Sequence, residues 1–186
     1  VIGGDLAGVA RFAEQWNGAA GGRINTALGP HSVYRCSPMF LARSAVVAAR
    51  LGIGIHIHVA VTEAETDAVL GRHGMTPVEV LDKNGVFDVP VTAVHAIHLT
   101  HVDIDLLAER GACVAYCPSA HTLQGLGETP VDLLTAAGVP VGIGTGGADA
   151  SFALNMFQAV RDATLLCAPR AGEPDHAQAV LRALRM

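Results

Sequence analysis

The sequence predicts an α/β fold in which short buried strands alternate with helices. Its 186 residues are 51% hydrophobic, which is enough for one domain with a substantial core. Glycine is abundant at 21 residues, whereas aromatic residues are scarce at 4%. Val- and Ile-rich segments that alternate with Ala- and Leu-rich segments have this composition, and they are typical of parallel strands covered by helices.

The N-terminal part of the chain follows this alternation. A helix is expected over 5–18, a short strand over 23–28, a helix over 38–51 and a strand over 53–60. Ser37 before a proline is typical of an N-cap with proline at the first helical position. The apolar side chains of the first helix should share one face: Leu6, Val9, Phe12, Ala13 and Trp16.

The later segments continue the alternation. Three further helices begin with a Thr whose third following residue is acidic, which is the capping-box pattern: Thr62 with Glu65, Thr76 with Glu79, and Thr100 with Asp103. The other expected elements are strands over 91–99, 113–117 and 139–145, a turn at 117–119, helices over 129–138 and 154–166, and a loop over 168–174 before a short terminal helix.

Two architectures fit five strands that are each followed by a helix. The first is an open doubly wound sheet with helices on both faces, and the second is part of a (β/α)8 barrel. No Gly-x-Gly-x-x-Gly motif follows the first strand, and ionisable residues gather at the C-terminal ends of successive strands, where barrels place catalytic groups. We therefore expect residues 1–186 to form a single partial domain, the C-terminal part of a (β/α)8 TIM-type barrel with about five βα units.

Charge and composition exclude several classes of partner. The net charge is −5 and no basic run occurs, so we expect no nucleic acid partner. Apolar runs stop well before the roughly 18 residues that span a bilayer, and no signal peptide is visible, so we expect no membrane partner. The four cysteines form no Cys-x-x-Cys pair. A soluble protein in a reducing, cytoplasmic compartment is therefore expected.

His56 and His58 form the sharpest local motif. Residues i and i+2 of a strand face the same side, so both imidazoles could reach a barrel mouth and coordinate Zn²⁺ or Fe²⁺. The alternative is that one histidine binds a ligand while the other packs or bonds to backbone.

Three other regions contribute histidines. A single His inside an apolar strand is more often a core residue than a catalyst, but the position of His95 one strand after His58 gives the two interpretations equal weight. His31 follows the first strand, where it is either a hydrogen-bond donor to a ring nitrogen or a turn residue. His98 and His101 are expected at the solvated surface.

Five segments in order resemble the amidohydrolase superfamily. The resemblance is to the branch that contains S-adenosylhomocysteine, methylthioadenosine and guanine-type deaminases and the triazine hydrolases, and it extends from about residue 20 to about residue 166. The segments that carry it are 29–37 (GPHSVYRCS), 56–60 (HIHVA), 94–99 (VHAIHL), 114–119 (VAYCPS) and 141–147 (VGIGTGG).

The resemblance implies a metal-dependent hydrolytic deaminase that acts on a nucleobase- or triazine-like ring, such as an adenosine derivative. In that chemistry a divalent metal, Zn or Fe, lowers the pKa of a bound water, hydroxide attacks the ring carbon and ammonia leaves. The resemblance assigns substrate contact to His31, metal ligation to His58 and orientation of the water or tetrahedral intermediate to His95. His56 is a weaker metal candidate.

The sequence also departs from the family pattern. Val61 stands where the family has a proton-carrying Glu, Gly146 where it has a metal-binding Asp, and His121 where it has an Asn. The first-strand His-x-His pair of the family has no counterpart. Of the expected metal ligands only His58 remains, so the chain holds a metal only if the site is completed, and otherwise none. Glu63 and Glu65 are near Val61, but they sit in a capping sequence and are expected to face solvent.

These departures keep a second function open, a catalytically degenerate relative that binds a ring ligand or is an inactive fragment. In either case a small heterocyclic molecule is the expected ligand. Five strands of an eight-stranded barrel leave two open edges, and open edges favour pairing with another chain, so a homo-oligomer is expected.

Overall fold

Five parallel strands form one sheet in the computed structural model, which describes residues 5–166. Their order in space is the same as their order in the chain, without the reversal that defines a doubly wound sheet. The α/β prediction is therefore confirmed, and the sheet has the order of a barrel wall. The strands are β1 (Ala27–Leu28), β2 (Gly54–Val59), β3 (Val91–His95), β4 (Cys113–Tyr116) and β5 (Val141–Ile143).

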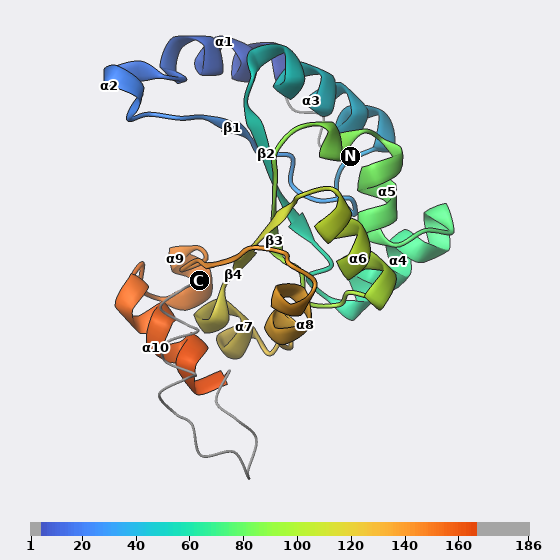
Figure 1. The fold of residues 1–186 in the computed structure, drawn as a ribbon, viewed down its shortest axis with the longest axis vertical. Coiled ribbons are helices and arrows are strands. Elements are labelled where there is room, and N and C mark those ends of the chain that lie inside the picture. Colours follow the sequence, from blue (N-terminus) through green and yellow to red (C-terminus); the bar gives the residue numbers. More distant parts are fainter. Residues whose placement is uncertain (1–4, 167–186) are drawn as a thin grey trace.

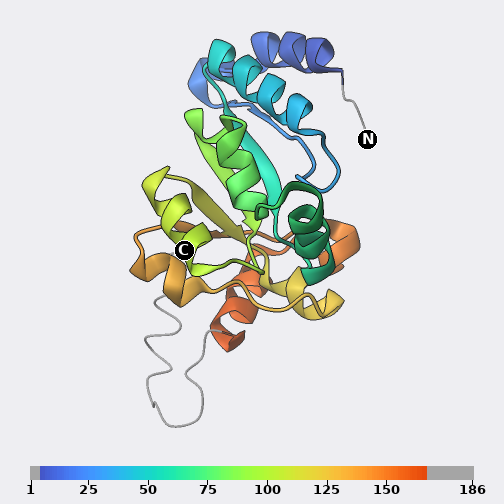
Figure 2. The ribbon, with the colours of Figure 1, turned by 90° about the vertical axis from the view of Figure 1, so that its right-hand side faces the viewer.

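The helices α3, α5, α6 and α8 lie on one side of the sheet, whereas α7 lies at its end beside α9 and α10 (Figure 1). In this layer α1 packs on α3, α5 on α6, and α6 on α8, and Figure 2 views the layer from its outer side. The helical elements are α1 (Leu6–Trp16), α2 (Ala19–Gly22), α3 (Pro38–Leu51), α4 (Glu63–His73), α5 (Pro77–Lys83), the 3₁₀ turn η1 (Val86–Asp88), α6 (His101–Glu109), α7 (Pro118–Gln124), α8 (Val131–Ala136), α9 (Ala148–Ser151) and α10 (Met156–Leu166).

The predicted helix starts are confirmed by their hydrogen bonds. The Ser37 side chain accepts a bond from the third following backbone N–H, and Thr76 and Thr100 each form a reciprocal capping box. Each cap satisfies backbone N–H groups that have no partner inside the helix. Thr62 also caps α4, but the Glu65 side chain does not complete that box.

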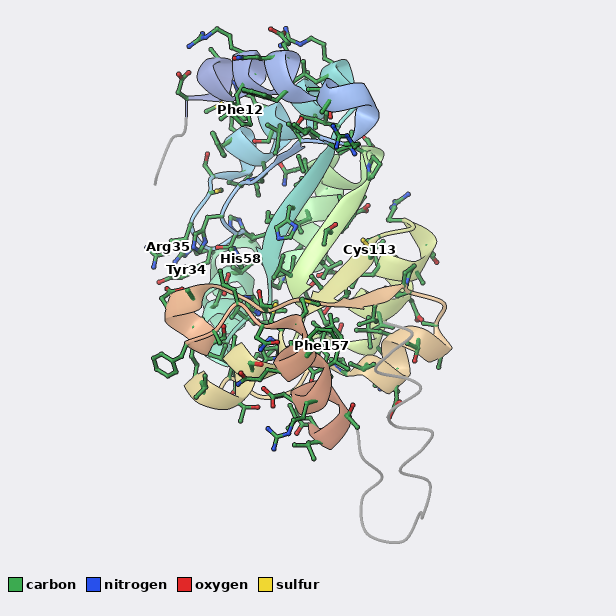
Figure 3. All side chains as sticks on the ribbon, turned by 90° about the vertical axis from the view of Figure 1, so that its left-hand side faces the viewer. Phe12, Tyr34, Arg35, His58, Cys113 and Phe157 are labelled. Carbon is green, nitrogen blue, oxygen red and sulfur yellow. The ribbon has the colours of Figure 1, made fainter. Side chains whose placement is uncertain are left out.

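Strand β2 shows how the sheet separates its core from its site. Ile55, Ile57 and Val59 are at most 1% exposed and belong to the core cluster that includes residues of the helical layer. His56 and His58 alternate with them and face the opposite side. Figure 3 looks onto the molecule from that side and shows His58 there. The expectation that His56 and His58 face the same side of their strand is therefore confirmed.

Several predicted boundaries also change. The strand expected over 91–99 ends at His95, because the positive φ angles of His95 (73°) and Ala96 (49°) break the extended run. The turn expected at 117–119 is instead the start of α7. The loop expected over 168–174 and the helix after it lie outside the described residues.

The predicted apolar face of α1 is only partly covered. Ala13 is 2% exposed, but Phe12 and Trp16 are 57% and 39% exposed. None of the helices within residues 5–166 has the length and hydropathy of a bilayer-spanning segment.

Candidate active site

Four imidazoles lie in a row across the C-terminal ends of the first four strands. The ring centroids of His31 and His58 are 4.9 Å apart, those of His58 and His95 are 5.4 Å apart, and those of His95 and His121 are 5.1 Å apart. Each ring comes from a different βα unit. The sheet therefore brings together histidines that are up to 90 residues apart in the sequence.

The first three rings and His56 line one open cavity of about 800 Å³. This volume lies within the range of pockets that bind small molecules. Tyr34 and Arg35 lie at the same cavity, near His58 in Figure 3. The structure thus gathers every histidine that the sequence selected as a site residue around one space.

The His58 ring has a fixed orientation and tautomer. Its Nδ1 lies 2.8 Å from the backbone carbonyl oxygen of His31, and a carbonyl can only accept, so Nδ1–H is the donor. The backbone N–H of His58 donates to the same oxygen at 3.1 Å. When the ring is neutral, its Nε2 therefore keeps a free lone pair, the arrangement seen in metal-ligating histidines.

The His95 ring is held at the end of β3 by its unusual backbone. Its φ of 73° lies in the left-handed region, which L-residues adopt only when their surroundings impose it. The buried Thr129 hydroxyl donates to the His95 carbonyl at 2.5 Å. Burial, followed by the charges of His58 and His56, lowers the pKa of His95 to about 4.

His121 contacts the His95 ring but does not line the cavity. Its Nε2 lies 2.9 Å from Nδ1 of His95, and its ring packs 5.4 Å from the ring of Tyr116. His121 is 2% exposed, and burial, with the charge of His95 second, lowers its pKa to about 3. The sequence marked His121 as a departure from the family pattern but gave it no role, and it predicted a turn where α7 begins.

The remaining histidines are less constrained. Burial and then the charge of His58 lower the pKa values of His31 and His56, with Arg35 as a third cause at His31. Nδ1 of His31 lies 3.2 Å from the Ser32 hydroxyl. His98 is not fully solvated as expected, because its half-buried Nε2 donates to the carbonyl of Leu126 at 3.2 Å.

Glu65 lines the cavity, so the expectation that it faces solvent is wrong. Its carboxylate is half-buried and accepts hydrogen bonds from the Ser32 hydroxyl and the Val61 backbone. Burial is the largest effect on its pKa and raises it, although these bonds and the charges of His58 and Arg35 act in the opposite direction. A carboxyl with this environment can hold a proton nearer neutral pH than a solvated one.

Two positions lack the polar groups that the family pattern has. Val61 and Gly146 both line the cavity. Gly146 has a φ of 68°, and a Cβ atom added there would lie 3.2 Å from Cβ of Ala120. The backbone conformation at Gly146 therefore favours glycine over other residues. Asp149, three residues later, lines the cavity and provides a carboxylate near this position.

The donors that the structure describes do not make up a metal site. Within residues 5–166 no group of three or more His, Cys, Asp or Glu side chains is placed to hold a metal ion. His58 offers one oriented imidazole, and one imidazole does not provide the three or four ligands that zinc sites need. Holding a metal here requires donors beyond the described residues.

Comparison with known proteins gives consistent matches. A model described as the amidohydrolase family matches residues 6–186. The chain is 44% identical over 163 residues to the 5-methylthioadenosine/S-adenosylhomocysteine deaminase of Moorella thermoacetica, a match that covers 88% of this chain and 38% of that protein.

Solved structures agree with this match. An adenosine deaminase from Xanthomonas campestris with bound zinc superposes with a TM-score of 0.85 at 31% identity, over 96% of this chain and 40% of that one. The atrazine chlorohydrolase of Arthrobacter aurescens complexed with zinc gives a TM-score of 0.84 at 26% identity, over 96% and 41%. The chain spans about two fifths of the length of these relatives.

Proposed function

The chain belongs to the amidohydrolase family, and from that membership we propose that its histidine-lined cavity is part of the active site of a hydrolytic deaminase for adenosine-type rings. The observation that carries the proposal is the convergence of His31, His58 and His95 on one cavity at the C-terminal ends of three successive strands. Catalytic groups of barrel enzymes come from these strand ends. The relative from Moorella thermoacetica bears the name of such a deaminase.

Each site residue has a role that fits its environment. His31 stands exposed at the cavity, where its ring can donate to a ring nitrogen of the substrate. His95 is neutral at neutral pH because its pKa is lowered to about 4, so it can orient a water or the tetrahedral intermediate through hydrogen bonds. His58 would offer its free Nε2 lone pair to a metal, and His56, which lines the same cavity, would be a weaker second ligand.

A divalent metal, zinc as in the two solved relatives or iron, would supply an activated water in this chemistry. The described residues provide too few ligands for it. The proposed activity therefore belongs to a protein in which further donors complete the site, either elsewhere in the polypeptide or on another copy.

The second candidate is a degenerate relative that binds a ring ligand without turnover. Val61 and Gly146 favour it, since neither can carry a proton or ligate a metal. The relatives that match are named as deaminases and hydrolases, and they do not favour it.

Ammonia release separates the two candidates. The full polypeptide in its native assembly, which includes the donors that complete the site, is incubated with S-adenosylhomocysteine, methylthioadenosine or 5′-deoxyadenosine, with and without added Zn²⁺ or Fe²⁺. Ammonia is measured by a coupled assay. Turnover of one of these substrates, lost in His95→Ala, is the expected result. Calorimetric binding of the same compounds without ammonia release would overturn the deaminase and support the degenerate relative.

A further inference from the structure

We propose that His121 is a positioning residue: its Nε2–H donates to Nδ1 of His95, and this bond keeps a proton on the cavity-facing Nε2 of His95. The inference deepens the proposed function and rests on it for its chemical meaning. The hydrogen bond itself can be tested without turnover, so the two can fail separately.

The geometry requires one shared proton between the two rings. Nδ1 of His95 and Nε2 of His121 are 2.9 Å apart, which is a hydrogen-bond distance. Two lone pairs at that distance would repel, and two N–H groups would clash. One nitrogen therefore carries the proton and the other accepts it.

Both rings are neutral under ordinary conditions. At pH 7.5, about one unit above the ordinary histidine pKa, an imidazole without a carboxylate partner is neutral. Each ring thus carries one proton at neutral pH. The proton that is not shared must then lie on the outer nitrogen of whichever ring accepts.

The surroundings of His121 decide between the two arrangements. If His95 donated, the proton of His121 would lie on its Nδ1, which is buried and has no hydrogen-bond partner within residues 5–166. A buried N–H without an acceptor is among the rarest defects in folded proteins. If His121 donates, its Nδ1 carries only a lone pair, which is a smaller defect.

The direction of this hydrogen bond determines whether the cavity-facing nitrogen of His95 carries a proton. His95 lines the cavity and His121 does not, so the Nδ1 edge of His95 faces inward and its Nε2 edge faces the cavity. With Nδ1 accepting, Nε2 carries the proton. His95 then acts as a hydrogen-bond donor to a bound oxygen or ring nitrogen, and it is not a metal ligand in this tautomer.

Substitution of His121 tests the assignment. His121→Phe keeps a ring of similar shape against Tyr116 but has no donor. His121→Gln places an amide N–H near the position of the lost Nε2–H and serves as the conservative rescue. His98→Gln is the matched control, because the ring of His98 bonds to the Leu126 carbonyl, not to the ring of His95.

The primary measurement is the histidine side-chain ¹⁵N spectrum at pH 7.5, a value about one unit above the ordinary histidine pKa, with His95 assigned by its loss in His95→Ala. We expect the Nε2–H tautomer of His95 in the wild type, in His121→Gln and in His98→Gln, and a mixture of tautomers in His121→Phe. An Nδ1–H tautomer of His95 in the wild type would overturn the inference. An unchanged tautomer in folded His121→Phe would overturn it as well.

Kinetics provide the second readout where the protein turns over a substrate. His121→Phe removes the hydrogen bond that orients the His95 ring, and it should lower kcat by about 10- to 100-fold with KM nearly unchanged. His121→Gln should recover most of that loss. Equal kcat in all variants would overturn the role of His121. A wild type that releases no ammonia would contradict the proposed function, while the spectrum still decides the hydrogen bond.

Discussion

The imidazole of His95 stacks on that of His58 with the planes 18° apart, although the two residues are out of step in the sheet. His58 pairs with Val94, and His95 pairs with the core residue Val59. Regular alternation would direct the His95 side chain toward the helical layer with Val59. The left-handed backbone of His95 turns the ring to the cavity instead. The irregular backbone at the end of β3 thus places the His95 imidazole at the cavity, beside those of His31 and His58.

Stability should depend on pH through the buried pair of His95 and His121. In the folded protein their pKa values are lowered to about 4 and about 3, whereas an unfolded histidine has a pKa of about 6.5. Below that value the unfolded chain binds more protons than the folded one, so stability is present above pH ~6.5 and is lost as the pH falls toward the folded values.

The urea midpoint of the wild type should therefore fall between pH ~6.5 and ~4, while His121→Gln, with one buried imidazole fewer, should fall less over the same range. Urea melts at closely spaced pH values measure this. Parallel declines in the two proteins would contradict the prediction.

Local elements of the fold were predictable because their causes are local. Ser37, Thr76 and Thr100 cap their helices through residues three positions away, so a short stretch of sequence contains the whole interaction. His31 and His58 were likewise found from strand ends and a period of two. These features need no knowledge of distant packing.

The parts of the site that were missed depend on tertiary packing. The sequence marked the position of His121, but its contact with a site residue became visible only when α7 brought it within 2.9 Å of His95, 26 residues earlier in the chain. Glu65 had the pattern of a capping residue, but the neighbouring Ser32 loop draws its carboxylate into the cavity. No sequence period encodes the positive φ of His95, which forms where Thr129 holds the carbonyl.

Removing the Thr129 hydroxyl should destabilise the protein. Thr129 is 5% exposed and donates to the His95 carbonyl, so Thr129→Val removes a buried hydrogen bond at a strained residue. We expect a loss of about 1–3 kcal/mol in the free energy of unfolding, measured in urea. Thr164→Val is the control, because its hydroxyl bonds only within α10 and such bonds add little. Equal effects of the two substitutions would refute the role of Thr129.

Neutralising Glu65 should stabilise the protein at neutral pH. Burial raises its pKa, so the folded state holds its proton more tightly than the unfolded state and stability falls as the pH rises through this window. Glu65→Gln removes that cost, and its advantage should disappear in acid. Glu63→Gln is the matched control in the same helical turn, because it removes a carboxylate without touching the Ser32 contact. Chemical denaturation at several pH values tests both, and a loss of stability in Glu65→Gln at neutral pH would contradict the expectation.

We also expect a homo-oligomer in solution. Among the described strands β1 and β5 each pair on one side only, and open edges favour pairing with another chain. Phe12, on the partly uncovered face of α1, is 57% exposed and adds apolar surface. Light scattering over a dilution series measures the mass, and a monomer at every concentration would disprove the expectation. Phe12→Glu tests whether α1 takes part in the contact.

Restoring a carboxylate at position 146 should not restore a metal site. The φ of Gly146 is 68°, and a Cβ there would meet Cβ of Ala120 at 3.2 Å, closer than ordinary van der Waals contact. Gly146→Asp should therefore destabilise the protein by about 1–2 kcal/mol. Gly146→Ala introduces the same Cβ without a charge, so a similar loss in both variants identifies backbone strain as the cause.

Zinc should not offset this loss. A ligand that binds only the folded state raises the free energy of unfolding in proportion to the logarithm of its concentration above its dissociation constant. In the Gly146→Asp variant, the cavity would offer the His58 imidazole and one added carboxylate, which is still short of the three or four ligands of a zinc site. Urea melts of this variant with and without zinc should coincide. A zinc-dependent gain in stability that a chelator reverses would show instead that the described residues already hold most of a metal site.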